Sequence, residues 1–319
     1  MSDARRATLP ALAKINLDLR VIGRREDGFH ELRTIFQTIS LADSIELTFT
    51  RARSTAIELD DPLAIPNNLV ERAAKAVLEA LRVAGRVEMR LRKRIPMGAG
   101  LGGGSSDAAA ILLGLPALCG RAIPLPELIR IGSHLGSDVP FFLLGGRAAG
   151  IGRGTELFPL TDLPPQHGAL VAPGVHVSTA EAYKALGARL TNELHPNKIE
   201  SFQSQLWGQG SAGTGVNDFE SVVFEAHPQL KPFKSKLLKA GASSALMTGS
   251  GSALFGLFPN RAAAARAVEL LGGRKSKPDG LKVHGISLVS RVRYQTLWWR
   301  ALDEHIDGRI WPPRSRYSR

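Results

Sequence analysis

The chain has 319 residues, of which 44% are hydrophobic and 22% charged, so it fits about two globular domains and excludes a fibrous or disordered protein. Its formal net charge of +12 is compatible with binding to nucleic acid, to an acidic lipid surface or to a phosphorylated substrate, and the charge alone does not distinguish these partners. A single cysteine, Cys119, excludes a disulfide framework, and no apolar run reaches the ~18 residues of a membrane span, so we expect a cytoplasmic protein without a membrane partner.

The first predicted element is a strand over residues 11–22, where hydrophobic and polar side chains alternate. Ile15 and Leu17 fall on one face, and Lys14, Asn16 and Asp18 fall on the other. Taken alone, this pattern favours an antiparallel strand whose polar face is solvated.

An Asp-Gly turn follows this strand and leads to two further predicted strands, over residues 32–41 and 44–51. Phe29 and His30 lie just beyond the turn, where an aromatic ring and an imidazole could face a ligand. From the residues alone, a core phenylalanine and a surface histidine are the favoured interpretation.

The strongest feature is the glycine-rich stretch over residues 96–107, between a predicted strand over 87–92 and a helix over 105–118. Glycines allow successive backbone N–H groups to turn toward an anion, and the N-terminus of the helix adds a positive dipole. Two serines and an aspartate before the alanine-rich run are typical of a capped helix start. The stretch therefore predicts a phosphate-binding loop.

Two familiar phosphate motifs fit this loop poorly. It lacks the Gly-Lys-Ser/Thr ending of a P-loop, so a lysine for the outer phosphates must come from elsewhere. Gly98, Gly100 and Gly103 satisfy the dinucleotide pattern, but the region about 20 residues on is a proline-punctuated loop rather than a strand that ends in an acidic residue.

A hydrolase is also disfavoured, because no G-x-S-x-G elbow exists.

The carboxylate of Asp138 has two possible roles. Asp138 leads directly into the apolar run over residues 139–144, and a buried carboxylate needs hydrogen bonds or a charge partner. A cap on the neighbouring turn is an equally good interpretation of this aspartate. Upstream, Asn67 or Asn68 is a suitable N-cap for a helix over residues 69–83.

The second half begins after a proline-rich boundary over residues 159–168. Residues 201–216 are rich in Gly, Ser and Gln and predict an exposed loop. Residues 248–252 form a second small-residue turn, which could meet the glycine loop across one cleft. The tail over residues 291–319 holds seven arginines and three of the four tryptophans, which suits nucleic-acid binding. A helix that packs its tryptophans on the body is the favoured interpretation.

Separated blocks of this sequence together resemble the GHMP kinases. They are residues 13–17 with 27–32, residues 96–110 and residues 135–140, and the turn at 248–252 matches a further motif of the family. Residues 96–106 match the pattern P-x-x-x-G-L-G-x-x-S-S throughout. The resemblance runs from about residue 8 to 290 and leaves the tail outside.

The resemblance implies an α+β, two-domain GHMP kinase fold with the active site in the cleft between the domains. The expected parts are a nucleotide-binding domain like ribosomal protein S5 over residues 1–165, a ferredoxin-like α/β sandwich over residues 166–290, and a basic extension over residues 291–319.

The resemblance also implies an activity. The first block is similar to a branch of the family that moves the γ-phosphoryl group of ATP to the tertiary 2-hydroxyl of a methylerythritol unit whose other end carries cytidine diphosphate, in non-mevalonate isoprenoid synthesis. Asp138 then matches the catalytic base and Lys14 its electropositive companion. The alternatives are another small-molecule GHMP kinase and, from a different class, a nucleic-acid-binding protein.

ATP contacts are implied for the glycine loop, whose backbone N–H groups and serine hydroxyls would wrap the triphosphate. These residues are Pro96, Met97, Gly98, Ala99, Gly100, Leu101, Gly102, Gly103, Gly104, Ser105 and Ser106. Asn68 and Leu69 would border the adenine. Mg²⁺ is expected with ATP, held mainly by phosphates and water, and no residue is assigned as a metal ligand.

Contacts with the second substrate are implied for residues from both halves of the chain. They are Asn16, Phe29, His30, Thr179, Tyr183, Thr248, Gly249, Ser250 and Gly251. His30 would read the edge of the cytosine, Phe29 and Tyr183 would sandwich the base, and Thr179 with residues 248–251 would contact phosphates or frame the cleft. We expect a monomer or weak dimer with no nucleic-acid partner.

Overall fold

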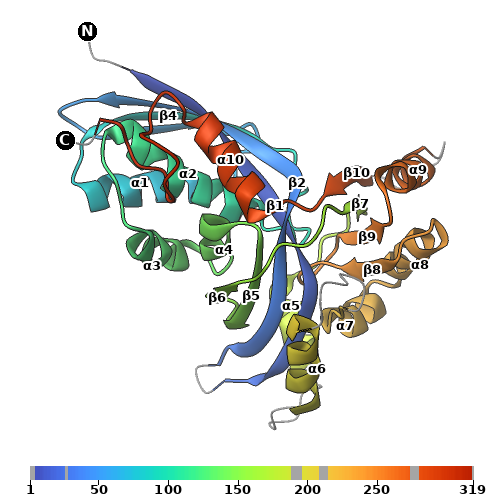
Figure 1. The fold of residues 1–319 in the computed structure, drawn as a ribbon. Coiled ribbons are helices and arrows are strands. Elements are labelled where there is room, and N and C mark those ends of the chain that lie inside the picture. The colour runs from blue at the N-terminus through green and yellow to red at the C-terminus, as the bar shows by residue number, and fades with distance from the viewer. Residues whose placement is uncertain (1–3, 26–27, 188–195, 208–214, 274–279, 318–319) are drawn as a thin grey trace.

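The computed structural model describes residues 4–25, 28–187, 196–207, 215–273 and 280–317. Two β-sheets with helices packed on them make up this part of the chain, which is the α+β class expected from the sequence (Figure 1). Within these ranges, no helix combines the length and the apolar character that crossing a membrane requires.

The first sheet is built on two very long strands, which Figure 1 shows in blue running through the molecule. Its strands are β1 (Arg5–Arg24), β2 (His30–Arg51), β3 (Ala56–Asp60), β4 (Gly85–Arg92), β5 (Arg147–Gly152) and β6 (Glu156–Pro159). The order is β3-β4-β2-β5-β6, β1 pairs with β2, and only the β3–β4 pair is parallel.

The prediction of two separate strands over residues 32–41 and 44–51 is wrong. Ala42 and Asp43, between them, stay in the ladder and pair with Leu12 and Ala11 of β1, so β2 is continuous. The register of β1 on β2 shifts between Leu12 and Lys14 and again further along. Such irregularities bend a strand and redirect its side chains.

Four helices cover the first sheet: α1 (Leu69–Leu81), α2 (Gly103–Cys119), α3 (Leu125–Leu135) and α4 (Val139–Leu144). Helix α2 is buried over almost its whole length, because its alanines and leucines pack against β1, β2 and the other helices. Asn68 caps α1, as predicted, by accepting a hydrogen bond from the backbone N–H of Val70.

The second sheet is antiparallel, in the order β10-β7-β9-β8. Its strands are β7 (His167–Ala172), β8 (Ser244–Met247), β9 (Leu254–Phe258) and β10 (Lys282–Ser287). Around it lie α5 (Thr179–Gly187), α6 (Pro196–Trp207), α7 (Phe219–Ala226), the 3₁₀ turn η1 (Pro228–Leu230), α8 (Lys231–Lys239) and α9 (Arg261–Gly272). The exposed loop predicted over residues 201–216 is wrong for 201–207, which belong to α6 and bury Phe202; residues 208–214 lie outside the described ranges.

The two sheets share a hydrophobic core. Ile15 and Leu17 of β1 pack in one cluster with Leu170 of β7 and Phe255 of β9. The second half therefore covers β1, and the polar residues Lys14, Asn16 and Asp18 are 4%, 2% and 0% exposed. The solvated polar face favoured from the isolated strand pattern is wrong, because tertiary packing encloses both faces of β1.

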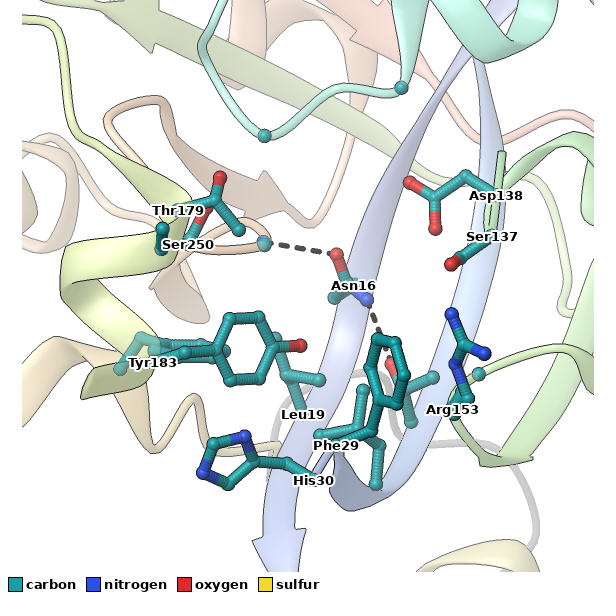
Figure 2. Close-up of a pocket in the computed structure, with 18 of the residues that line it drawn as sticks. Asn16, Leu19, Phe29, His30, Ser137, Asp138, Arg153, Thr179, Tyr183 and Ser250 are labelled. Carbon is teal, nitrogen blue, oxygen red and sulfur yellow. Dashed lines mark hydrogen bonds between the residues drawn. The ribbon is translucent and has the colours of Figure 1, made fainter. Parts of the chain in front are cut away.

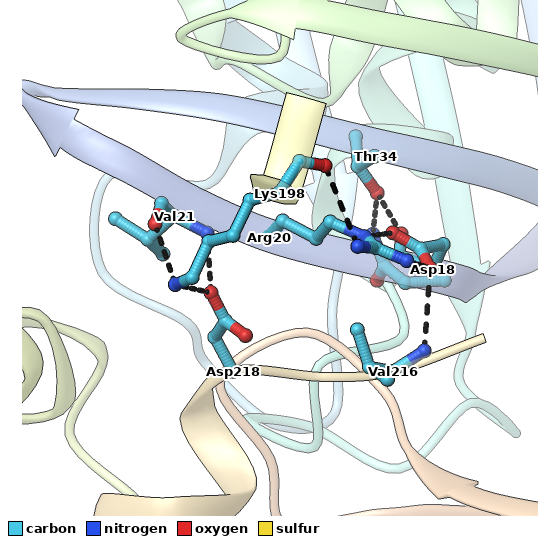
Figure 3. Close-up of polar contacts among 8 residues, drawn as sticks. Asp18, Arg20, Val21, Thr34, Lys198, Val216 and Asp218 are labelled. Atoms are coloured by element: carbon cyan, nitrogen blue, oxygen red, sulfur yellow. Dashed lines mark hydrogen bonds and ion pairs between the residues drawn. The ribbon is translucent and has the colours of Figure 1, made fainter. Parts of the chain in front are cut away.

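A buried polar network fastens α6 and the segment before α7 to β1 (Figure 3). Asp18 pairs with Arg20 and accepts a hydrogen bond from the backbone N–H of Val216. Lys198 of α6 donates to Asp218 and to the carbonyl of Val21. Burial raises the pKa of Asp18, although its hydrogen bond and charge contact with Arg20 act in the opposite direction.

The last helix, α10 (Arg291–Ala301), returns to the first sheet. Tyr294 and Trp298 of α10 are each 1% exposed and belong to the first core. The Trp311 indole donates to the carbonyl of Leu143. The tail thus packs its aromatic side chains on the body of the molecule, as favoured from the sequence.

Candidate functional site

A cavity of about 920 Å³ lies where β1, β2, the glycine loop, α5 and the turn after β8 converge. Both halves of the chain contribute to its walls (Figure 2). The lining includes Lys14, Asn16, Phe29, His30, Gly100, Gly102, Ser105, Ser137, Asp138, Arg153, Thr179, Tyr183, Lys184, Gly249 and Ser250. Residues that the sequence placed in three separate blocks therefore border one space.

Lys14 and Asp138 form a pair at one end of this cavity. The Lys14 ammonium lies 3.4 Å from the Asp138 carboxylate and donates to Asn16 Oδ1 at 2.8 Å. The Lys14 side chain is 5% exposed and that of Asp138 is 32% exposed. Asp138 precedes α4 but makes no side-chain cap bond, so the capping role left open by the sequence is not seen.

Asn16 links this pair to the second half of the chain. Its Oδ1 also accepts from the backbone N–H of Gly249 and the hydroxyl of Thr248, and its Nδ2 donates to Thr34. With every polar atom of its side chain engaged, Asn16 has one orientation and fixes the position of the Lys14 ammonium.

The glycine loop and the turn at residues 248–252 meet directly. The Ala253 N–H donates to the carbonyl of Ala99, and the Thr248 hydroxyl lies 3.3 Å from the carbonyl of Gly100. A Cβ at Gly100 would stand 2.1 Å from the carbonyl oxygen of Thr248, and the φ of Gly100 is +77°. Only glycine lets the two backbones approach this closely.

Helix α2 starts differently from the serine and aspartate cap predicted by the sequence. Gly102, with φ 69°, is the N-cap and makes no side-chain bond. The Ser106 hydroxyl instead donates to the carbonyl of Leu12, and Asp107 accepts from Lys93. The cap prediction is wrong because both side chains tie α2 to the sheet beneath it.

The eleven loop residues predicted to bind ATP fall into three groups. Gly100, Gly102 and Ser105 line the cavity. Ala99, Leu101 and Ser106 are at most 5% exposed, so they offer a ligand little beyond their backbone. The remaining five, Pro96, Met97, Gly98, Gly103 and Gly104, do not line the cavity and are half-buried or exposed.

The two residues predicted to border the adenine differ in their surroundings. Asn68 is 6% exposed, and its side chain is engaged with Asp61 and with Val70 at the start of α1. Leu69 approaches the loop, with Cδ1 3.8 Å from where a Cβ of Gly104 would lie. Neither residue lines the cavity.

Aromatic rings gather at the other end of the cavity. His30 stacks on Tyr183 with ring centroids 5.0 Å apart, and Phe29 lies under the guanidinium of Arg153 at 3.6 Å. Burial, and then the charge of Arg24, lowers the pKa of His30. Burial raises the pKa of Tyr183 to about 12, with the negative charge of Asp138 adding to the effect. Both rings are therefore neutral near pH 7 and suited to an uncharged base.

Thr179 and Ser250 line the cavity next to each other, with their hydroxyl oxygens 2.8 Å apart. Thr248 is fully buried and acts through Asn16 and Gly100 rather than at the surface of the cavity. Gly251 does not line the cavity, and its N–H donates to the carbonyl of Thr248.

Comparison with known proteins decides the family. Residues 68–146 match the GHMP kinases N terminal domain, and residues 199–273 match the GHMP kinases C terminal region. The chain is 62% identical over 322 residues to the 4-diphosphocytidyl-2-C-methyl-D-erythritol kinase of Solibacter usitatus (strain Ellin6076), with 100% of each chain covered. The chain belongs to the GHMP kinases.

Two further comparisons place this GHMP kinase in its family. The 4-diphosphocytidyl-2-C-methyl-D-erythritol kinase of Syntrophotalea carbinolica (strain DSM 2380 / NBRC 103641 / GraBd1) is 40% identical, covering 83% of this chain and 94% of its own. The crystal structure of a 4-(cytidine 5'-diphospho)-2C-methyl-D-erythritol kinase superposes with a TM-score of 0.74 at 38% identity, covering 88% and 98%. The two-domain GHMP kinase fold is thereby confirmed. We expected the tail over residues 291–319 to lie outside the resemblance. For the Solibacter relative this is wrong, because the match covers the whole of this chain, the tail included.

Sequence reasoning missed several residues of the GHMP kinase site. Thr34 and Asn217 are buried positioning groups: the Asn217 amide donates to the carbonyls of Met247 and Gly249 and so holds the turn after β8. Ser137 and Arg153 line the cavity. Ser137 could have been found from the sequence, because it adjoins Asp138 in the block over residues 135–140 that resembles the family. Asn217 and Arg153 could not, because each contacts residues at least 30 positions away in the chain.

The cavity offers few side-chain donors to a metal ion. Among the described residues, no group of three or more His, Cys, Asp or Glu side chains could hold one. Asp138 and Ser105 are oxygen donors that line the cavity. This sparse set fits a magnesium ion that keeps most of its water and arrives with phosphate groups, rather than a protein-made cage.

Proposed function

We propose that this GHMP kinase transfers the γ-phosphoryl group of ATP to the 2-hydroxyl of 4-(cytidine 5'-diphospho)-2-C-methyl-D-erythritol, giving the 2-phosphate and ADP in the non-mevalonate route to isoprenoid precursors. One observation carries the proposal: a single cavity joins a glycine loop, a lysine–aspartate pair and a group of neutral aromatic rings. The 62% identity to a full-length relative of that name supports it.

Asp138 is the general base of this reaction. A tertiary alcohol is a crowded and weak nucleophile, so it needs a carboxylate that receives its proton as the phosphoryl group arrives. The Asp138 carboxylate faces the cavity, and the Lys14 ammonium beside it stabilises negative charge that develops on the oxygen. Asn16 keeps the ammonium in place.

The glycine loop binds the phosphates of ATP. Its positive-φ glycines expose backbone N–H groups, and the N-terminus of α2 directs its dipole at the same point. Mg²⁺, held by phosphate oxygens and water with Asp138 and Ser105 within the same cavity, would neutralise charge on the β- and γ-phosphates.

The aromatic end binds the cytosine. His30 lines this end and is the side chain assigned to the edge of the base; its Nε2 is buried toward Gly187 and has no hydrogen-bond partner among the described residues. Phe29 and Tyr183 supply ring faces on the two sides of that end (Figure 2). Because ATP is an intracellular nucleotide, we place the reaction in the cytoplasm, and we expect a monomer or weak dimer.

An assay of ADP release with three alcohols tests the proposal. The purified chain with ATP and Mg²⁺ is supplied in turn with the cytidine-linked methylerythritol, homoserine and mevalonate. We expect turnover with the first alone, and product analysis should place the new phosphate on the 2-hydroxyl. Equal turnover with homoserine or mevalonate would contradict the substrate assignment.

A further inference from the structure

Arg153 lies on a tight turn between β5 and β6 that is built from two glycines. Gly152 and Gly154 have φ values of 65° and 84°, and the Gly154 N–H donates to the carbonyl of Ile151 at 2.9 Å. Residues other than glycine rarely adopt such φ values. The two glycines therefore set the shape of the turn and the direction in which the Arg153 side chain leaves it. That direction is into the cavity, which Arg153 lines.

The guanidinium of Arg153 is stacked on an aromatic ring, and its positive charge is not paired with a carboxylate among the described residues. Its central carbon lies 3.6 Å from the centroid of Phe29. Among the described residues, no carboxylate lies within ion-pair distance of Arg153, whereas Lys14 is paired with Asp138. Stacking uses the face of the guanidinium and leaves its N–H donors free around the edge.

The position of this charge matches the middle of the proposed substrate. Figure 2 shows Arg153 on the side of Phe29 away from Tyr183, with its guanidinium turned toward Ser137. The cytosine is assigned to the aromatic end and the reacting hydroxyl to Asp138. The diphosphate that joins them must therefore cross the part of the cavity between Phe29 and Asp138, which Arg153 borders.

Besides Arg153 and Lys14, which is paired with Asp138, two cations line the cavity, Arg24 and Lys184. Arg24 pairs in register with His30 across the β1–β2 hairpin, and its charge acts on the His30 ring. Lys184 follows Tyr183 in α5. We assign both to the aromatic end and Lys14 to the reacting hydroxyl, which leaves Arg153 as the cation that borders the route between them.

We propose that Arg153 binds the diphosphate of the nucleoside-diphosphate substrate while its guanidinium remains stacked on Phe29. This inference rests on the proposed function. An arginine presents donors in a planar fork that suits phosphate oxygens, and bonds between charged groups are stronger than neutral ones. Arg153 is thus a specificity determinant for a diphosphate-linked alcohol over a free one.

The test separates the diphosphate from the base. Calorimetric titration of the full-length wild type and of Arg153→Gln with cytidine 5'-diphosphate and with cytidine gives four affinities. We expect Arg153→Gln to weaken diphosphate binding by about 10- to 100-fold and to leave cytidine binding within about twofold. Arg53→Gln, which removes the same charge from an exposed residue outside the cavity, should change neither affinity.

The outcomes distinguish binding from support of the ring. An equal loss for cytidine and cytidine diphosphate would mean that Arg153 only holds Phe29, and unchanged affinities would mean that it does neither; both overturn the inference. Arg153→Lys should recover part of the diphosphate affinity if the charge is what matters. Failure of the proposed function is separable, because the wild type itself would then bind no cytidine diphosphate.

Discussion

Lys14 and Asp138 differ in their exposure to solvent, and the difference suits their proposed roles. The lysine side chain is 5% exposed and its ammonium contacts both Asn16 and Asp138, so its position is set by the fold. The aspartate side chain is 32% exposed and opens to the cavity, which leaves a carboxylate oxygen accessible to an incoming hydroxyl.

Asp138→Asn should therefore lose the chemical step and keep nucleotide binding. The amide has nearly the same shape but cannot accept the proton, so we expect kcat to fall by about 10²- to 10⁴-fold. ATP affinity, measured by titration, should stay within about threefold. Asp60→Asn, which neutralises an exposed carboxylate on β3, serves as the control, and turnover of Asp138→Asn near the wild-type rate would remove Asp138 from the role of base.

A second aspartate lies directly beneath the glycine loop. Lys93 donates to both Asp43 and Asp107, so one cation serves two buried carboxylates. Asp107 Oδ1 has no hydrogen-bond partner in the part of the chain that the structure describes. Burial raises the pKa of Asp107 to about 7, the charge of Lys93 opposes this, and the charge of Asp43 adds to it.

Asp107→Asn should change how stability depends on pH. Between the ordinary pKa of 3.8 and about 7, the folded chain holds a proton that the unfolded chain has released, so wild-type stability falls as the pH rises through this window. The amide removes this penalty. We expect the free energy of unfolding of Asp107→Asn, relative to wild type, to increase by a few kcal/mol between about pH 5 and about pH 8.

Urea unfolding at the two pH values, followed by circular dichroism, measures this difference. Asp303→Asn, an exposed aspartate in the tail, controls for the loss of one negative charge. A difference between Asp107→Asn and wild type that does not change with pH would contradict the raised pKa.

At the level of elements, the glycine loop is fixed at both ends. Before the loop, Asp43 of β2 accepts from the backbone N–H groups of Arg94 and Ile95. After the loop, Asp107 in the first turns of α2 is joined to the same site through Lys93. Further bonds from Lys14 N–H to Leu101 and from Ser106 to Leu12 tie the loop to β1. A loop rich in glycine is thereby ordered largely by contacts of the segments before and after it and by its bonds to β1.

Gly100→Ala should separate the loop from the turn after β8. The new Cβ would lie 2.1 Å from the Thr248 carbonyl oxygen, which is backbone and must shift. Overpacking of this kind costs about 1–3 kcal/mol, so we expect kcat/KM for ATP to fall by about tenfold or more.

Gly308→Ala is the matched control for Gly100→Ala. Gly308 has a φ of +66° but nothing within 4 Å of its Cβ position, so it carries the backbone strain without the clash. Equal kinetic constants for the two variants would show that contact between the loop and the turn is unimportant.

The sequence could predict those elements whose signals are local. The alternation of hydrophobic and polar residues around Lys14 predicted β1, and the glycines followed by alanines predicted the loop and α2. It could not show that the polar face of β1 is buried, because the covering residues belong to the second half of the chain. Arg153 was missed for the same reason: its partner Phe29 lies on another hairpin, and no local pattern marks contacts between hairpins.

Across the whole molecule, the tail supports the helix that follows the proposed base. Asp138 immediately precedes α4, and the Tyr294 hydroxyl and Trp311 indole donate to the carbonyls of Phe142 and Leu143 at the other end of that helix. Trp298, one turn beyond Tyr294, is buried in the first core with them. None of these tail residues lines the cavity, so their contribution is to stability.

Trp298→Ala should therefore lower stability without changing substrate affinity. Removing a fully buried tryptophan leaves a cavity and typically costs about 3–5 kcal/mol. Trp299, the next residue, is only half-buried and offers the matched control, so Trp299→Ala should cost clearly less. Urea unfolding followed by far-UV circular dichroism compares the two, since fluorescence would change with the tryptophan itself. The KM values of folded Trp298→Ala should stay within about twofold of wild type. Equal stability of the two variants would mean that α10 adds little to the first core, whereas a raised KM would mean that the tail acts on the site through α4.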